Sequence, residues 1–206
     1  MPTLLSQLVS RPPEQFQTER LIIRAARPGD GHAVNDAIRE SIDSLRPWMS
    51  WARVVPSVAE SESFARESSI RYRSREELAM LLFRKSDGWF VGASGLHTIS
   101  WDVPRMEIGY WVRTSLQGQG YITEAVRGIA AFAFTVLKAE RLEIRCDANN
   151  ARSAAVAERA GFTLESRMRW QSRTPNGDLR DTLVYTMFSD GIPEAITKAA
   201  HHLHPE

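Results

Sequence analysis

Apolar residues recur every three or four positions in two stretches of the chain, 30–45 and 120–138, which is the spacing of one face of a helix. The longer stretch, 120–138, is interrupted by few charges, so this helix should lie against a sheet. Capping signals agree with the pattern, because Asp30 can cap the first helix and Ser57 and Glu60 form a capping box at the start of the second. The four helices are expected over 30–45, 57–72, 120–138 and 152–160.

Shorter apolar or alternating runs, bounded by turn residues, predict strands. Three of them precede the long helix with only turns between them, which favours an antiparallel meander, and the last two are joined through the hairpin signal Asn176-Gly177. The strands are expected over 21–23, 78–83, 89–97, 106–112, 141–146, 163–173 and 179–188. The order β-α-α-β-β-β-α-β-α-β-β predicts one α/β domain over 18–189, after a lead-in at 1–17 and before a tail at 190–206 that can hold a short helix.

Composition fits an ordinary globular enzyme or binding domain. The 206 residues suit one domain, and 26 basic against 25 acidic residues give a net charge of +1, which argues against a dedicated nucleic-acid binder. The single cysteine, Cys146, excludes a disulfide framework and a cysteine-rich metal site, and it fits a reducing compartment. No apolar stretch reaches the roughly 20 residues of a membrane span, and residues 1–16 lack the basic start of a secretory signal. We therefore expect a cytoplasmic protein without a metal.

The segment 116–121 joins a predicted strand to the long helix and carries Gly118 and Gly120. Glycine lets the backbone approach a ligand closely, and the free N–H groups of a first helical turn point outward with the positive end of the helix dipole behind them. Such a combination binds pyrophosphate. The lysine and Ser/Thr of a P-loop are missing, and so is the third glycine of a dinucleotide-binding fingerprint. By itself the motif is equally compatible with a tight strand-to-helix turn.

Further motifs in the same order add a family resemblance. Together they resemble the GNAT superfamily of acetyl-CoA-dependent N-acetyltransferases, and within it the RimJ/RimL type that acetylates the N-termini of ribosomal proteins. The resemblance implies a mixed, mostly antiparallel sheet that splays in the middle, acetyl-CoA as co-substrate in the gap, and acetyl transfer to an amine, above all the α-amine of a protein N-terminus. It covers residues 18–189 and rests on the segments 18–21 (TERL), 107–112 (EIGYWV), 117–125 (QGQGYITEA), 149–153 (NNARS) and 158–162 (ERAGF).

The same resemblance implies which residues bind the co-substrate. Backbone N–H groups around Trp111 and Val112 would serve the thioester carbonyl, and Asn150 would hold the pantetheine arm. Ser153 would lie near the sulfur as a proton donor, although a serine at a helix start also has an ordinary structural role. The pyrophosphate cradle would consist of Gln117, Gly118, Gln119, Gly120 and Tyr121.

The chain departs from the family pattern at positions that bear on the chemistry. Ile122 takes the place of a small residue in the phosphate motif, and the tyrosine that serves as acid in many members falls near Ala157 here. RimL-like proteins carry a glutamate on the strand after Gly-Phe, whereas 169–173 contains no acid. Glu107 is the best substitute as general base, with a structural role at the sheet edge as the alternative, and His97 is a further candidate.

The missing strong base also bears on the acceptor. An α-amine with a pKa of ~7.7–8.0 is roughly 10–15% neutral at pH 7, whereas a lysine amine with a pKa of ~10.4 is almost entirely protonated. A site with a weak base therefore favours an N-terminal amine, or deprotonation relayed by water, over lysine.

Trp48, Trp51, Trp101 and His97 are the candidates for the acceptor groove, although local packing explains the tryptophans equally well. Arginines at alternate positions of 167–173 share one face of a strand, which together with the resemblance suggests a homodimer. Two alternatives stay open: an acetyltransferase whose acceptor is a small amine, and a non-catalytic module that binds acyl-CoA. Neither nucleic acid nor a membrane is expected as a partner.

Overall fold

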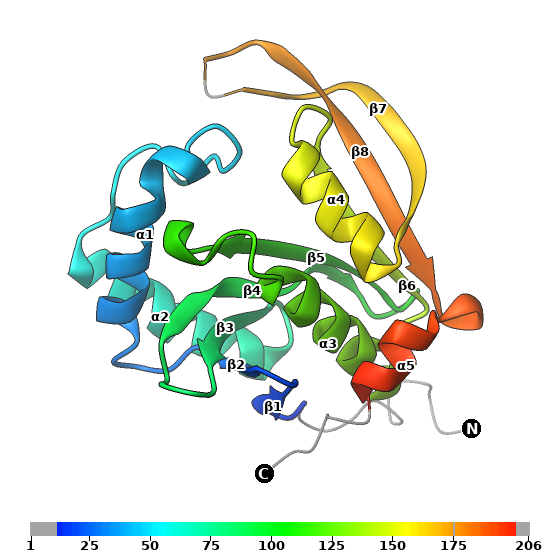
Figure 1. Ribbon diagram of the computed structural model, residues 1–206, viewed down its shortest axis with the longest axis horizontal. Coiled ribbons are helices and arrows are strands. Elements are labelled where there is room, and N and C mark those ends of the chain that lie inside the picture. The colour runs from blue at the N-terminus through cyan, green and yellow to red at the C-terminus, as the bar shows by residue number, and fades with distance from the viewer. Residues whose placement is uncertain (1–11, 175, 201–206) are drawn as a thin grey trace.

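The computed structural model describes residues 12–174 and 176–200. Within these ranges eight strands form one sheet in the order β1-β2-β3-β4-β5-β6-β8-β7, with helices on both faces (Figure 1). The strands are Gln15–Gln17 (β1), Leu21–Ala25 (β2), Leu78–Arg84 (β3), Phe90–Ser100 (β4), Arg105–Val112 (β5), Arg141–Asp147 (β6), Thr163–Arg173 (β7) and Leu179–Phe188 (β8). The helices are Gly31–Leu45 (α1), Val58–Ser74 (α2), Tyr121–Thr135 (α3), Ala151–Ala160 (α4) and Glu194–Ala200 (α5), with 3-10 turns at Thr114–Leu116 (η2) and Ser189–Gly191 (η3).

The predicted strands and helices are all present within a few residues of their expected bounds. β1 was missed because three residues carry no readable pattern. It pairs with β2 and buries Phe16, whose ring stacks on Phe132 with the centroids 5.0 Å apart. The short helix expected in the tail is present as α5, whose Ile196 is buried in the main core, while residues 201–206 of the tail lie outside the described range. β1 and α5 thus extend the packed unit beyond 18–189.

The two predicted helix caps differ in outcome. The capping box is confirmed, since the Ser57 hydroxyl accepts a hydrogen bond from the Glu60 N–H and the Glu60 side chain accepts one from the Ser57 N–H. Asp30 does stand at the N-cap position of α1, but its carboxylate makes no capping bond. It accepts instead from the Arg24 guanidinium at 2.6 Å and from the Arg27 N–H at 2.7 Å. A charged partner on β2 therefore outcompetes the helix terminus for this carboxylate.

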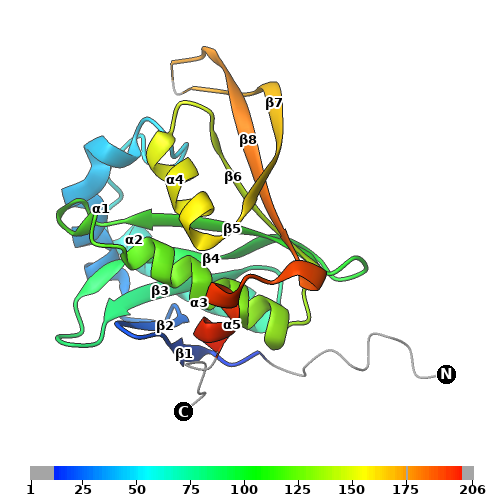
Figure 2. The same cartoon turned by 45° about the vertical axis from the view of Figure 1, so that its right-hand side comes forward.

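The sheet opens between β5 and β6. All other neighbouring strands are antiparallel, whereas these two are parallel and share a register over only three pairs, from Arg105↔Arg141 to Glu107↔Glu143. Beyond Glu107 the two strands diverge, and α4 lies above the gap while β7 and β8 form an arm behind it (Figure 2). The structure confirms the mixed, mostly antiparallel sheet that splays in the middle.

Two clusters of buried apolar residues form the core of the fold. The larger forms around α3, whose side chains are buried along almost its whole length. They pack against strands on both sides of the gap between β5 and β6. The smaller lies beneath α1, where Ile38 and Leu45 pack against Leu81 and Phe90. Helices therefore border the open edge of β5 on both faces of the sheet. α1 lies on one face, and α3 and α4 lie on the other. No helix of the described residues has the length and apolar character needed to cross a membrane.

Candidate active site

The gap between β5 and β6 contains a cavity of about 790 Å³. The end of β5, the turn before α3 and the first residues of α3 and α4 supply most of its wall, and the end of α1 closes it on the far side. The lining residues that the sequence assigned to the co-substrate are Trp111, Val112, Gln117, Gly118, Gly120, Tyr121, Asn150 and Ser153. We call this space the cofactor cavity.

The turn before α3 has the conformation that the glycines predict. Gly118 and Gly120 have φ angles of +73° and +81°, in the left-handed region that favours glycine. Gly120 is the N-cap of α3, so the N–H groups of the first turn, starting at Tyr121, face the cofactor cavity without side-chain caps. Gln119 differs from the expectation, because its side chain donates to the Ser115 carbonyl and does not line the cavity.

Arg20 fixes this turn from the far end of the sequence. Its Nε lies 2.6 Å from the Glu124 carboxylate on α3, and its Nη1 donates to the Gln119 carbonyl at 3.0 Å. The guanidinium also lies 4.6 Å from the centroid of the Tyr121 ring. The residues flanking Gly120 are therefore held from both sides, which keeps the N–H cradle preorganised.

A second anchor ties the turn to α1. Glu40 accepts hydrogen bonds from the Arg113 guanidinium at 3.0 Å and from the Ser115 N–H at 2.8 Å. Burial acts to raise the pKa of Glu40, but these bonds outweigh it and hold the pKa below its ordinary value. The Ser41 hydroxyl accepts from the Thr114 N–H at 2.9 Å. The 3-10 turn η2 thus joins the two helices that border the cavity.

The end of β5 presents only some of its N–H groups to the gap. Arg113 N–H donates to the Val91 carbonyl of β4, and successive N–H groups along a strand point in alternate directions. The N–H of Val112 therefore faces the cofactor cavity, whereas that of Trp111 faces β4. Of the two N–H groups that the resemblance implies for the carbonyl, that of Val112 is the one directed away from β4, and Trp111 contributes its indole to the other face of the sheet.

Ser153 lies at the start of α4 and has a partner that the sequence did not reveal. The Tyr110 hydroxyl is 3.0 Å from both the Ser153 Oγ and the Ser153 carbonyl oxygen. Burial raises the pKa of Tyr110 well above its ordinary value, so this hydroxyl stays protonated and can donate. The pair lines the cofactor cavity from β5 and α4. No local pattern could have found it, because the two residues are 43 positions apart.

Asn150 and Gln117 are held by neighbours on the cavity wall. Asn150 caps α4, its side-chain oxygen accepting from the Ser153 N–H at 3.1 Å. The Gln117 oxygen accepts from Arg152 at 2.9 Å, and this contact joins the turn before α3 to α4 across the cavity. Both residues thus occupy the wall where the resemblance placed the co-substrate.

A second cavity, of about 540 Å³, lies on the opposite face of the sheet between β4, α1, α2 and the segment that connects the two helices. We call it the acceptor cavity. Met49, Tyr110 and Trp111 line both cavities, so the two meet at the end of β5. Trp51 and His97 line the acceptor cavity, whereas Trp48 lines the cofactor cavity.

Trp101 lines neither cavity. It lies at the β4–β5 turn, which is the end of these strands far from the junction of the cavities. The Arg75 Cζ lies 4.2 Å from the centroid of the Trp101 ring, and the indole N–H donates to the Arg75 carbonyl at 3.3 Å. The structure therefore places Trp101 apart from the other residues expected at the acceptor groove. Cys146 is buried on β6, outside both cavities, and burial raises the pKa of its thiol, which fits a packing role.

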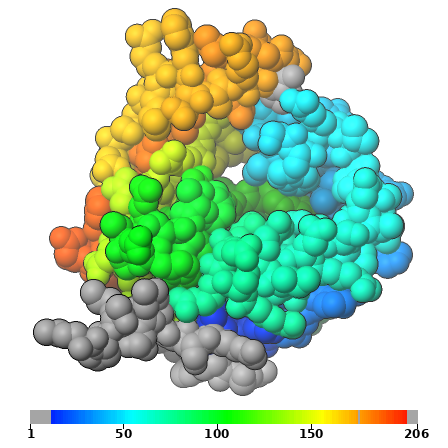
Figure 3. Space-filling view, turned by 180° about the vertical axis from the view of Figure 1, so that it is seen from behind, coloured from blue at the N-terminus to red at the C-terminus, as the bar shows by residue number. Residues whose placement is uncertain are grey.

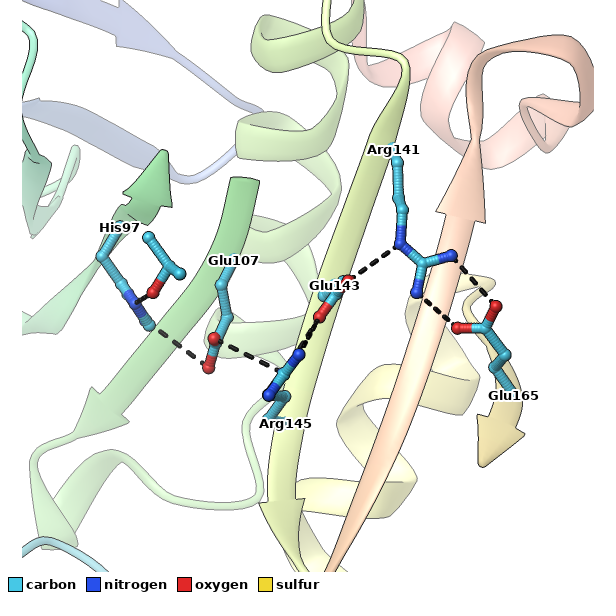
Figure 4. Close-up of polar contacts among 7 residues, drawn as sticks. His97, Glu107, Arg141, Glu143, Arg145 and Glu165 are labelled. Carbon is cyan, nitrogen blue, oxygen red and sulfur yellow. Dashed lines mark hydrogen bonds and ion pairs between the residues drawn. The ribbon is translucent and has the colours of Figure 1, made fainter. Parts of the chain in front are cut away.

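A ladder of charged side chains crosses the sheet where β5 and β6 separate (Figure 4). His97 and Glu107 are cross-strand neighbours, with Nε2 and Oε1 3.9 Å apart, and Arg145 Nε lies 3.7 Å from the other Glu107 oxygen. These distances are longer than hydrogen bonds. The ladder continues through Glu143, which Arg145 contacts at 2.8 Å, and ends with the pairing of Arg141 and Glu165.

The two glutamates at the centre of this ladder, Glu107 and Glu143, have pKa values shifted in opposite directions. Burial acts to raise the pKa of Glu143, but hydrogen bonds from Arg141 and Arg145 lower it below the ordinary value. Burial also raises the pKa of Glu107, and there His97 and Arg145 offset the effect only in part. Glu107 is therefore the carboxylate of the ladder that takes up a proton more readily than an ordinary glutamate.

His97 separates Glu107 from the acceptor cavity. A Cβ on Gly109 would come within 2.9 Å of the His97 Nε2, so the imidazole lies over this glycine on the face that carries Glu107. His97 lines the acceptor cavity, whereas Glu107 is not part of its wall. Within the described residues, no group of three or more His, Cys, Asp or Glu side chains is arranged to hold a metal ion.

A splayed sheet, an N–H cradle at a helix start and a second cavity that meets the first together define a transferase with two substrates, one of which carries a pyrophosphate. Residues 20–163 match the sequence model of the GNAT acetyltransferase domain. The chain therefore belongs to the GNAT family and is an acetyl-CoA-dependent N-acetyltransferase, which confirms the resemblance.

Its relatives include proteins named for ribosomal substrates. YdaF of Bacillus subtilis, named as a candidate ribosomal N-acetyltransferase, is 30% identical over 82% of this chain and 91% of its own length. The ribosomal-protein-serine acetyltransferase of Escherichia coli is 27% identical over 70% and 82%. The solved RimL α-N-acetyltransferase of ribosomal protein L7/L12, in complex with coenzyme A, is 25% identical with a TM-score of 0.80 over 86% of this chain and 99% of that one.

Proposed function

We propose that this acetyltransferase transfers acetyl to the α-amine of a protein N-terminus. The observation that carries the proposal is the junction of the two cavities at Met49, Tyr110 and Trp111, which lets a thioester and an amine approach one another from opposite faces of the sheet. The names of the relatives support ribosomal proteins as acceptors. Acetyl-CoA supplies the activated acetyl group, and the residues of the chain orient it and move the protons.

The amine loses its proton toward Glu107 in this proposal. The imidazole of His97 lies over Gly109, two residues before Trp111, which is roughly 7 Å along the strand from the junction of the cavities. A short chain of water molecules can connect the imidazole to an amine at the junction, and the imidazole lies beside Glu107. This route suits an α-amine, because a tenth of such amines are already neutral near pH 7.

The departing thiolate takes a hydrogen bond from Ser153. When the Ser153 hydroxyl donates to the sulfur, the Tyr110 hydroxyl can donate to the Ser153 Oγ at 3.0 Å, so charge that develops on sulfur is shared over two hydroxyls. On the other side of the reacting carbon, the Val112 N–H serves the carbonyl oxygen. Asn150 supports this arrangement by capping α4 at Ser153.

The pyrophosphate cradle leads to a prediction for coenzyme A binding. The backbone of a valine at position 120 would be strained at φ +81°. Relief of this strain would turn the first N–H groups of α3 away from the cofactor cavity. We expect Gly120→Val to weaken the binding of coenzyme A at least tenfold, about 1.4 kcal/mol, by calorimetry. Gly88→Val is the control, since Gly88 has φ +69° in a turn outside both cavities. Equal affinity in a folded Gly120→Val protein would refute this location of the pyrophosphate.

The acceptor class is tested with matched peptides. One peptide has a free α-amine and an internal lysine, a second has the same sequence with an acetylated N-terminus, and the readout is coenzyme A release with mass spectrometry of the product. We expect acetylation of the α-amine alone. Acetylation of the lysine alone, or of small amines but no peptide, contradicts the proposal, and the absence of turnover with any amine would support an acyl-CoA-binding module.

We also propose that the protein forms a homodimer in the cytoplasm. β7 is an edge strand whose residues are almost all exposed, and such an edge favours pairing with another chain unless it is covered. Light scattering at micromolar concentration should give twice the monomer mass, and the monomer mass would contradict the dimer. The single cysteine, Cys146, is a free thiol, as a reducing cytoplasm permits.

A further inference from the structure

The walls of the acceptor cavity distinguish between acceptors, an inference that rests on the proposed function. Most of its lining is apolar or aromatic, with Ile38 and Met49 from α1 and the segment after it, Phe64 from α2 and Leu96 from β4. Trp51 and Trp111 form an aromatic wall with their ring centroids 6.1 Å apart. The surface favours a group that is removed from water by apolar contact.

The few charged residues of this cavity do not offer a partner for a charged side chain. Among the residues that the structure describes, no lysine or arginine lines it. The Glu60 carboxylate accepts hydrogen bonds from the N–H and hydroxyl of Ser57, and Glu77 pairs with Arg71 at 3.4 Å. An acidic acceptor side chain would meet two carboxylates, with the His97 imidazole beside Glu107 as the basic group on the described wall, and a basic one would have to compete for carboxylates that already have partners.

The size of the cavity favours a large side chain over a small one. Its 540 Å³ correspond to roughly 18 water molecules at about 30 Å³ each. The hydroxymethyl group of serine would leave most of this volume to water beside apolar walls, whereas a leucine, methionine or phenylalanine side chain would displace more of that water and cover more of the apolar wall.

The position of the amine directs the first side chain of the acceptor into this space. The α-amine must reach the thioester where the cavities meet, and the first side chain is attached to the carbon beside that amine. The rest of the peptide has a route outward, because the surface is open between the α1–α2 segment and the β7–β8 arm (Figure 3). We propose that the enzyme selects protein N-termini whose first residue has a large apolar side chain, and not the serine for which the Escherichia coli relative is named.

The test compares peptides that differ only in their first residue, with leucine, methionine, phenylalanine, alanine, serine or aspartate. We expect kcat/KM to be at least tenfold higher for leucine, methionine or phenylalanine than for serine, and lowest for aspartate. Acetylation of the serine peptide at an equal or higher kcat/KM would overturn this inference and leave the proposed function intact. Acetylation of free apolar amines with no peptide product would overturn both.

Two variants connect the preference to the cavity. Trp51 and Phe64 are 47% and 39% exposed, so their truncation should leave the fold intact, and we expect Trp51→Ala and Phe64→Ala each to reduce the leucine-to-serine ratio at least threefold. Ile70→Ala is the matched control on α2, since Ile70 is 66% exposed and lines neither cavity. A ratio that all three variants leave unchanged would show that the preference arises elsewhere and would overturn the assignment.

Discussion

Ser153→Ala is expected to lower kcat by about 10- to 1,000-fold while the affinity for coenzyme A stays nearly unchanged. A thiol leaving group has a pKa near 8.5, so the developing thiolate needs a hydrogen-bond donor and not a strong acid. The Ser153 hydroxyl is that donor in our proposal, whereas the pyrophosphate cradle lies at Gly118 and Gly120 and does not involve it. The measurement is single-turnover acetyl transfer, alongside calorimetry with coenzyme A.

The substitution leaves the surrounding structure in place. The backbone N–H of residue 153 still donates to Asn150, and the carbonyl of residue 153 still accepts from the Tyr110 hydroxyl at 3.0 Å. Tyr110→Phe is the companion variant. It removes the outer hydroxyl only, so we expect a smaller loss of kcat than for Ser153→Ala. Wild-type kcat in Ser153→Ala, with chemistry shown to be rate-limiting, would remove the serine from the mechanism.

Glu107→Gln is expected to lower kcat/KM by about 100-fold and to remove the acidic limb that Glu107 gives to the pH profile. The carboxylate accepts a proton only when it is ionised. Because burial raises its pKa, the activity of the wild-type enzyme should fall as the pH drops through a value above the ordinary glutamate pKa. Protonation of the acceptor amine gives a separate limb near pH 8, which should persist in the variant.

Two features make this variant interpretable. Arg145 keeps its contacts with Glu143 at 2.8–2.9 Å when the Glu107 charge is lost, so the ladder should persist. Glu165→Gln is the matched control, because Glu165 lies at the opposite end of the same ladder, on β7, and lines neither cavity. An equal loss of activity in both variants, or an unchanged acidic limb in Glu107→Gln, would assign Glu107 a structural role.

The parts of the site that lie close together in the sequence were predictable from it. The N–H cradle depends on Gly118, Gly120 and the helix that follows them, and these few residues determine its geometry. The place of Ser153 at the start of α4 was predictable for the same reason, because a helix start can be read from local sequence.

Contacts between distant segments were not predictable. Arg20 reaches Glu124 across 104 positions, and Tyr110 reaches Ser153 across 43, so no periodicity connects either pair. The position of Trp101 could not be read either, because the sequence shows an aromatic residue at a turn but not which end of the strands that turn occupies. The gap itself follows from the point where β5 and β6 stop pairing, at Glu107 and Glu143, which depends on packing of the whole sheet.

The central claim is that acetyl-CoA and the acceptor amine meet at the end of β5 from two separate cavities. Calorimetry with a conjugate in which coenzyme A is joined through an acetyl bridge to the α-amine of a leucine-first peptide tests this most directly. We predict that the conjugate binds at least 100-fold more tightly than coenzyme A, since joining the two ligands removes the cost of bringing the second to its site, and that both Gly120→Val and Trp51→Ala weaken it. A conjugate that binds no more tightly than coenzyme A, with an affinity that Trp51→Ala leaves unchanged, would contradict the claim.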